Sequence, residues 1–334
     1  MVDFPNRREW LAGTLRSDFR VAMDRGYSTQ LTVRNFQKPW SDVYRWAIAN
    51  GPPGWQHSPL SWHMRCETHI ASGPGVERDL MEQIAKELSS GGNLLLTRAS
   101  DKDPVYRPFH LPDSIPPGLE TAYVVFGEVL GYAILHQSPL PVASATSFVR
   151  GVLGRVEIQV TFATEKRDFQ ELQEMDAQEA NTLQWIRNKD RTSEDLYAAD
   201  LTFSLEETTD IIPGLTRGTT VETKLGRRDV TEKITHQNRN EYVAFRPMRQ
   251  VDRVSSSSAV RATRKGLTSV VPLEHLSVFS TAEVALILGG AKEFSVVDMR
   301  NSVKWPAGTK THRNSLFGFS GFWKKRAQMS VLCF

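Results

Sequence analysis

The residues of this sequence best suited to chemistry are its two cysteines, Cys66 and Cys333. A cysteine thiolate can attack a carbonyl carbon or bind a metal ion. Cys66 lies between His63 and His69 in the pattern HxxCxxH, and His57 is the one further ligand candidate nearby. A structural zinc site needs four ligands, and this short segment alone offers three. A nucleophile and a zinc site therefore stay open for Cys66, while a buried structural cysteine is the simpler interpretation.

The remaining motifs give little support to cofactor chemistry. Two cysteines so far apart make no disulfide framework and no CxxC metal pair, which favours a reducing, intracellular environment. Gly91-Gly92 and Gly289-Gly290 follow helical segments and end them rather than forming a phosphate loop. No GxSxG nucleophile motif occurs. The basic clusters Arg227-Arg228 and Lys324–Arg326 are short and are typical of solvated faces. We expect no cofactor and no metal.

Composition indicates a globular protein with room for two or three units of domain size. Of the 334 residues, 40% are hydrophobic and 24% are charged. The 41 basic and 38 acidic residues leave a net charge of +3, which indicates no nucleic-acid and no membrane partner. The N-terminus lacks the apolar core of a signal peptide. The densest apolar run, residues 122–135, contains Glu128 and is shorter than the roughly 20 residues of a membrane span. We expect a soluble, cytoplasmic protein.

The elements that must position these residues are mostly helices. In the first half, hydrophobic periodicity predicts a short strand over residues 31–36 and helices over 7–25, 76–88, 121–136 and 148–153. The helix over 121–136 is apolar almost all round, so it should be buried. Its Gly127 and Gly131 favour close packing of soluble helices. Four tryptophans indicate either a small packed core or a ligand surface: Trp40, Trp46, Trp55 and Trp62.

In the second half, one helix is predicted over residues 169–187. Two segments then alternate apolar and polar residues, around Phe203 and around Val221. We expect them to pair as a small antiparallel sheet through a Pro213-Gly214 turn. Thr235 can cap a following helix, residues 255–258 (SSSS) interrupt it, and Ser280 begins a capping box with Glu283. The predicted class is α+β.

The order of these signals resembles the HECT-type ubiquitin ligases. The family has a leucine-rich helix, an acidic turn and a DLTF-like strand, and here these are TLQWIRNKD and SEDLYAADLTFSLEE. Its next helix begins with a VTxxNxxEYV pattern, similar to ITHQNRNEYV in residues 234–243. Further similar segments follow or precede in the expected order: RKGLTSVVPLEHLSVFSTAEVALILGG, FSVVDMRNSVKW, GVERDLMEQIAKEL and VFGEVLGYAILHQSPLPV. Each segment alone is weak, but their shared order is specific.

The resemblance implies a helix-rich HECT N-lobe with a small inserted antiparallel β-sheet subdomain. Residues 73–305 correspond to this N-lobe, and about 170–250 to the small subdomain that binds the ubiquitin-conjugating enzyme, the E2. Residues 1–72 stay unassigned. Residues 306–334 resemble a linker and the start of the C-lobe, which we expect to be truncated. Only residues 72–75 remain of the aspartate-glycine-glycine turn that the family places before Val76.

The resemblance also implies the chemistry. HECT ligases accept ubiquitin from the E2 onto a C-lobe cysteine and pass it to a substrate lysine. Cys333-Phe334 matches the family's cysteine-phenylalanine pair and is the one catalytic candidate, although it follows Phe322-Trp323 much sooner than in the family. The resemblance places the apolar groove for the E2 at five positions, of which Leu196 and Tyr197 are expected to be exposed: Leu183, Ile186, Leu196, Tyr197 and Leu201. For Leu183, Ile186 and Leu201, a position in the hydrophobic core is an equally good interpretation.

Three functions are compatible with the sequence. The first is a HECT-type ubiquitin transferase, or a fragment of one, whose partners are an E2, ubiquitin and an unidentified protein substrate. The second is an inactive protein that binds an E2 without forming a reducible ubiquitin adduct. The third is an enzyme of another class that uses Cys66 and its histidine neighbours.

Overall fold

The computed structural model describes most of the chain up to residue 290. The described ranges are 3–23, 29–35, 37–50, 60–66, 69–90, 95–99, 105–111, 115–155, 161–188, 190–210, 212 and 218–290. The chain divides into two units, residues 1–290 and 291–334, and the first contains every described helix and strand. Whether the N-lobe begins at residue 73 and ends at 305 stays a prediction.

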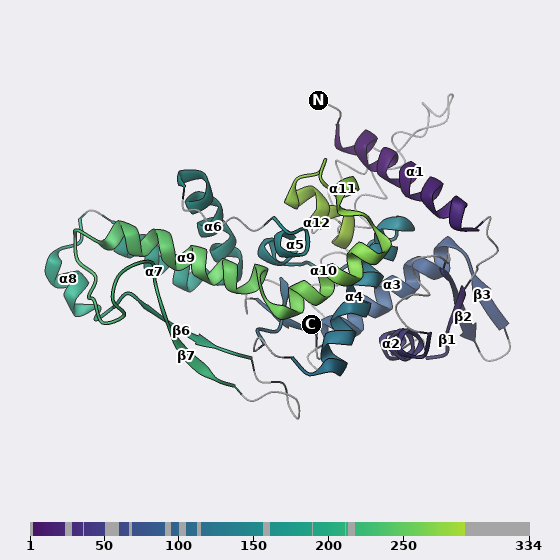
Figure 1. Ribbon diagram of the computed structural model, residues 1–334, viewed down its shortest axis with the longest axis horizontal. Coiled ribbons are helices and arrows are strands. Elements are labelled where there is room, and N and C mark those ends of the chain that lie inside the picture. The colour runs from purple at the N-terminus through teal and green to yellow at the C-terminus, as the bar shows by residue number, and fades with distance from the viewer. Residues whose placement is uncertain are drawn as a thin grey trace, which may run out of the picture. The chain divides into compact units, whose positions relative to one another are not determined.

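Helices dominate the described part (Figure 1). They are α1 Phe4–Met23, α2 Pro39–Asn50, α3 Pro74–Ser89, α4 Pro117–Leu135, α5 Thr146–Val152, α6 Phe162–Met175, α7 Ala177–Arg187, α8 Ser193–Ala198, α9 Arg239–Ser255, α10 Ser258–Val270, α11 Leu273–Leu276 and α12 Thr281–Gly289. The strands are β1 Thr29–Val33, β2 Leu60–Cys66, β3 His69–Ser72, β4 Leu96–Arg98, β5 Tyr106–Pro108, β6 Ser204–Thr208 and β7 Thr220–Lys224.

These strands form three small sheets, with the orders β1-β2-β3, β4-β5 and β6-β7. The antiparallel pairing of β6 with β7 sets Leu205 opposite Thr223, which confirms the predicted pairing, while the Pro213-Gly214 turn lies outside the described residues. The pairing of β1 with β2 is parallel and has no counterpart in the sequence prediction. Helices with small, mainly antiparallel sheets confirm the predicted α+β class.

The centre of the main hydrophobic core is α4, which lies beside α10 (Figure 1). Glycines let the two backbones come close, because a Cβ at Gly127 would lie 1.9 Å from the Thr263 carbonyl oxygen. A Cβ at Gly266 would likewise lie 1.8 Å from the Val124 carbonyl oxygen. No side chain fits at these distances. The close packing predicted from Gly127 and Gly131 is confirmed, and its partner helix is α10.

By length and composition, α4 is also apolar enough to cross a membrane. However, 83% of its apolar window is buried inside the protein. A helix that is apolar all round and covered by other helices is typical of a protein core.

One acidic side chain lies inside this core. Glu128 on α4 is 2% exposed, and its carboxylate makes no hydrogen bond or ion pair with any residue that the structure describes. Burial raises the pKa of Glu128 from 4.5 to about 8, because a desolvated carboxylate is costly when charged. The folded protein therefore holds a proton that the unfolded chain releases at neutral pH.

We expect Glu128→Gln to remove a pH-dependent loss of stability. Because the folded pKa is raised, the unfolding free energy of the wild type falls as the pH rises from 4.5 towards 8. One pKa unit corresponds to about 1.4 kcal/mol. Between about pH 5 and about pH 7, the unfolding free energy of the variant should rise relative to that of the wild type by on the order of 3 kcal/mol. Urea denaturation at several pH values measures this difference.

The matched control is Glu120→Gln, because Glu120 is an exposed glutamate on the same helix. Its unfolding curves should follow the wild type across the pH range. If the unfolding free energies of the wild type and Glu128→Gln depend on pH in the same way, burial does not raise the pKa of Glu128.

A second hydrophobic core joins α6, α7, α8, the β6-β7 hairpin and the start of α9. We call this the second core; its buried members are Leu172, Ala180, Leu183, Ile186, Leu196, Phe203, Leu205, Leu225, Ile234, Tyr242 and Val243. Buried ion pairs connect it to the main core, since Arg150 on α5 lies 3.4 Å from Asp168 and 3.0 Å from Glu171, both on α6.

Local capping corrects the prediction around the second core. The single helix expected over 169–187 is two helices, because Asp176 accepts a hydrogen bond from the Glu179 backbone and caps α7 anew. The expected charged turn contains α8, which begins with a capping box between Thr192 and Asp195. The capping box at Ser280 and Glu283 is confirmed.

Other expectations have mixed outcomes. Asn238, not Thr235, is the N-cap residue of α9. The serine interruption is confirmed, because Ser257 caps α10. Trp40 and Trp46 pack against the main core, which favours the packed-core interpretation for these two tryptophans. Arg228 is more than a solvated cation, since it pairs with Glu232 and Glu241.

Candidate functional site

The second core opens on one side into a groove of about 260 Å³. We call it the groove; its lining is Asp176, Gln178, Glu179, Thr182, Leu183, Ile186, Leu201, Tyr242 and Arg246. Its volume lies below the roughly 300–1,000 Å³ of small-molecule sites. The groove therefore suits one or two side chains of a protein loop better than a free metabolite.

Three of the five residues singled out by the sequence meet in this groove. Leu183 and Ile186 lie one helical turn apart on α7, and Leu201 precedes β6. Leu183 is 2% and Ile186 is 0% exposed, so both belong to the second core and form the floor of the groove at once. Leu201 is partly buried. The core and groove interpretations of these residues thus describe one surface.

The other two residues lie on α8 and differ from each other. Tyr197 is 76% exposed, as expected from a polar turn. Leu196 is 2% exposed, so the expectation that it would be exposed is wrong. The capping box starts a helix here, and adjacent residues of a helix point to different faces. Leu196 therefore packs into the second core, while Tyr197 faces solvent.

Six of the nine groove residues are missing from the sequence prediction, and two of them, Tyr242 and Arg246, lie on α9. They lie one turn apart on α9 and form the wall opposite α7. Tyr242 falls within the ITHQNRNEYV segment, whose pattern indicates a helix start but no groove. Its ring contacts Phe203 edge to face, with 5.5 Å between the ring centroids. Burial raises the pKa of Tyr242, so its hydroxyl stays protonated at neutral pH.

The polar groups of the groove hold one another in place. Arg246 donates from Nε to Glu179 Oε1 over 2.6 Å and from Nη1 to the Tyr242 hydroxyl over 3.1 Å. Gln250 donates to the second carboxylate oxygen of Glu179 over 3.2 Å. Because Glu179 and Arg246 neutralise each other, the groove combines an apolar floor with a fixed polar wall.

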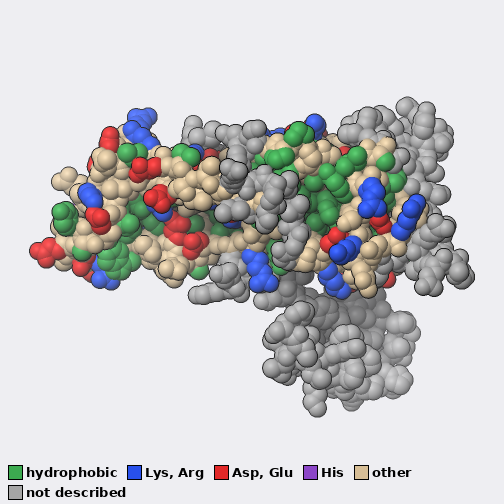
Figure 2. Space-filling model, turned by 90° about the horizontal axis from the view of Figure 1, so that it is seen from below, with side chains coloured by type: hydrophobic (Ala, Val, Ile, Leu, Met, Phe, Trp, Pro, Cys, Tyr) green, Lys and Arg blue, Asp and Glu red, His purple; other side chains and the backbone are tan. Residues whose placement is uncertain are grey.

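Acidic residues flank the exposed tyrosine in the chain. Glu194 and Asp195 occupy the first turn of α8, and Asp200 follows the helix. Hydrogen bonds from the Thr192 backbone and hydroxyl lower the pKa of Asp195, so this carboxylate is charged at neutral pH. Figure 2 shows hydrophobic side chains among acidic and basic ones at the left, where α8 lies in Figure 1. α8 thus carries an exposed tyrosine and two carboxylates, while Asp200 pairs with Lys233.

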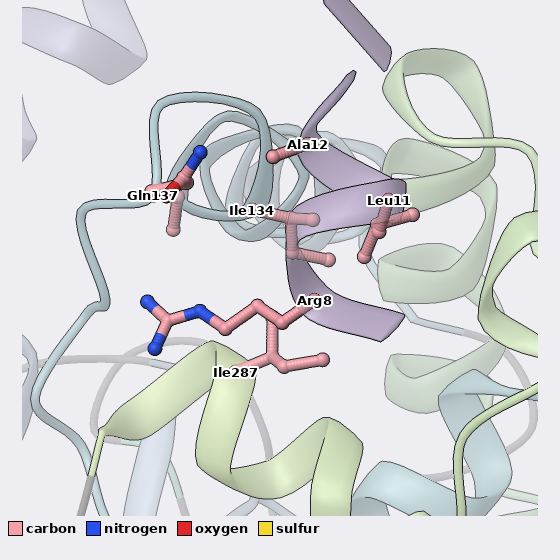
Figure 3. Close-up of a pocket in the computed structure, with 7 residues that line it drawn as sticks. Arg8, Leu11, Ala12, Ile134, Gln137 and Ile287 are labelled. Carbon is pink, nitrogen blue, oxygen red and sulfur yellow. The ribbon is translucent and has the colours of Figure 1, made fainter. Parts of the chain in front are cut away.

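The small cavity beside α1 has a different character. Its volume is about 10 Å³, room for about one water molecule. Figure 3 shows Leu11, Ile134 and Ile287 around it, with the side chains of Arg8 and Gln137 on one side. It is a packing gap between helices, so the groove is the better candidate site.

The hypotheses about Cys66 and Cys333 depend on side chains that the structure does not describe. Cys66 pairs with His69 across β2 and β3, and His63 lies opposite Ser72. The side chains of these residues lie outside the described part, as do His57 and Cys333. Nucleophilic and metal-binding roles for Cys66, and a catalytic role for Cys333, stay predictions.

The sequence is similar to a family model and to several known proteins, and all of them are ubiquitin ligases or transferases. The model of the HECT domain, described as a ubiquitin-transferase, matches residues 82–331. The E3 ubiquitin-protein ligase HACE1 of Danio rerio is 26% identical over 236 residues, which cover 71% of this chain and 24% of that protein. UPL2 of Arabidopsis thaliana, also an E3 ubiquitin-protein ligase, is 23% identical over 323 residues, or 92% of this chain and 8% of that protein.

A third similar protein, the E3 ubiquitin-protein ligase HECW1 of Mus musculus, is 26% identical over 182 residues. They cover 54% of this chain and 10% of that ligase. The chain thus spans about a quarter of the length of the first of these relatives and less of the other two. The matched residues include all nine that line the groove.

Proposed function

Because the chain belongs to the HECT-domain (ubiquitin-transferase) family, we propose that it acts in an E3 ubiquitin ligase and that its groove docks an E2. The groove carries this proposal. It combines the apolar floor of Leu183, Ile186 and Leu201 with a polar wall, and it lies on the second core. A protein loop with an apolar tip would fill the floor and remove it from water, which is the main source of affinity in such contacts.

Docking would be the first of three proposed steps. A cysteine thiolate of the ligase then attacks the carbonyl carbon of the ubiquitin thioester, and the E2 thiolate leaves. A substrate lysine amine next attacks the new thioester, an amide bond forms, and the ligase thiolate is released. Cys333 is the one candidate nucleophile suggested by the resemblance. We propose that this reaction takes place in the cytoplasm.

Tyr197→Ala tests the docking proposal without disturbing the second core. Tyr197 is 76% exposed on α8, whose Leu196 belongs to the same second core as the groove floor, so its removal should leave the folded structure intact. Tyrosines are frequent hot spots of docking surfaces, and the loss of one costs about tenfold in affinity. We expect the Kd for an E2 that binds the wild type to rise about tenfold. Isothermal titration of that E2 into each variant measures it.

Val221→Ala is the matched control. Val221 is 59% exposed on β7 and, unlike Tyr197, is not among the positions that the resemblance assigns to the E2, so the E2 should bind this variant as it binds the wild type. The proposal would be contradicted if the E2 bound the Tyr197 variant with wild-type affinity but bound the Val221 variant more weakly. The docking surface would then lie elsewhere than at the groove.

A further inference from the structure

Arg246 presents fixed hydrogen-bond donors at the wall of the groove. Its Nε donates to Glu179, and its Nη1 donates to both the Tyr242 hydroxyl and the Ser204 carbonyl oxygen, each over 3.1 Å. These bonds use three of the five N–H donors of the guanidinium group. They also fix the plane of the group, because the guanidinium is rigid.

The remaining two donors belong to Nη2 of Arg246. No residue within the described ranges accepts a hydrogen bond from this nitrogen. The Arg246 side chain lines the groove and is 22% exposed. Nη2 therefore stays accessible to a molecule in the groove.

The charge of this arginine is already compensated. Glu179 pairs with it over 2.6 Å, and Gln250 holds Glu179 in place. A compensated guanidinium gives little extra attraction to a full negative charge, but it still needs an acceptor for its free N–H groups. A ligand that covers Nη2 without an acceptor would leave these donors unsatisfied, at the cost of affinity.

We propose that Arg246 makes the groove selective for E2 loops that set a hydrogen-bond acceptor, such as a backbone carbonyl, beside the apolar tip. This inference rests on the proposed function, and it adds a criterion for the choice of partner. The apolar tip would contact Leu183, Ile186 and Leu201, while the neighbouring acceptor would bind Nη2. Loops with an aliphatic or basic group at that point would bind more weakly.

The test uses the full chain and an E2 that binds it. Arg246→Met keeps most of the aliphatic stem and removes the donors, and we expect the E2 affinity to fall about tenfold. Arg249→Met is the control, since Arg249 lies on the same helix as Arg246, pairs with Glu207 of β6 and does not line the groove. The double variant Glu179→Gln/Arg246→Met leaves no uncompensated carboxylate and should show the same loss. Thermal unfolding confirms that each variant is folded.

A second readout separates recognition from a purely structural role. In the wild type, the Nη2 protons of Arg246 should move in the NMR spectrum and exchange more slowly with water when the E2 is added. Unchanged Nη2 signals in the complex would overturn the proposal, as would equal E2 affinities of the Arg246→Met and Arg249→Met variants. If no E2 binds the wild-type chain at all, the proposed function itself fails, which is a different result.

Discussion

Gly266→Ala should destabilise this protein by about 3 kcal/mol or more, although it adds one methyl group. The new Cβ would lie 1.8 Å from the Val124 carbonyl oxygen and 2.9 Å from the Glu128 backbone nitrogen. These are backbone atoms of α4 and cannot rotate away, so α4 and α10 would have to separate. Separation would open the main core along both helices. Urea denaturation of the full chain measures the loss.

Gly13→Ala is the matched control for this substitution. Gly13 also lies in a helix, α1, but a Cβ there would have no atom within 4 Å. Alanine is the better helix former by roughly 0.5–1 kcal/mol, so Gly13→Ala should leave the protein as stable as before or more so. Similar effects of the two alanines would contradict close packing of α4 on α10.

Hydrophobic periodicity predicts the helices α3 and α4 of the main core, but not α2, β4 or β5, which contribute Val43, Leu96 and Tyr106 to it. The apolar face of α3 and the all-round apolar surface of α4 are both buried as expected, because a long run of the same periodicity has few alternative structures. The capping box of α12 is equally readable, since its two residues lie three apart in the chain. Local signals of this kind depend on neighbours in sequence alone.

The features that the sequence does not predict depend on contacts or on short competing signals. The break between α6 and α7 arises from one capping aspartate, Asp176, inside an otherwise periodic segment. The burial of Leu196 is not predicted because α8 is too short for its periodicity to stand out. Tyr242 and Arg246 join the groove only because α9 folds back against α7. No pattern within α9 alone indicates that contact.

Leu201→Glu should abolish most of the affinity for an E2. Leu201 lines the groove and is partly exposed, so its side chain is available to a docked loop. Loss of a central apolar contact costs about 2 kcal/mol or more, which is about 30-fold in Kd. A carboxylate at the same position would add the cost of burying a charge against an apolar tip. We therefore expect a Kd at least about 30-fold above that of the wild type.

The most direct test of E2 docking in the groove is isothermal titration of one E2 into the wild type, Leu201→Glu and Val221→Glu. The Val221 variant also places a carboxylate at an apolar position, here on β7 and away from the groove, and thermal unfolding shows whether all three proteins are folded. We predict that the E2 binds the wild type and the Val221 variant with similar Kd and binds the Leu201 variant at least about 30-fold more weakly. Equal affinity for the wild type and folded Leu201→Glu would contradict docking in the groove.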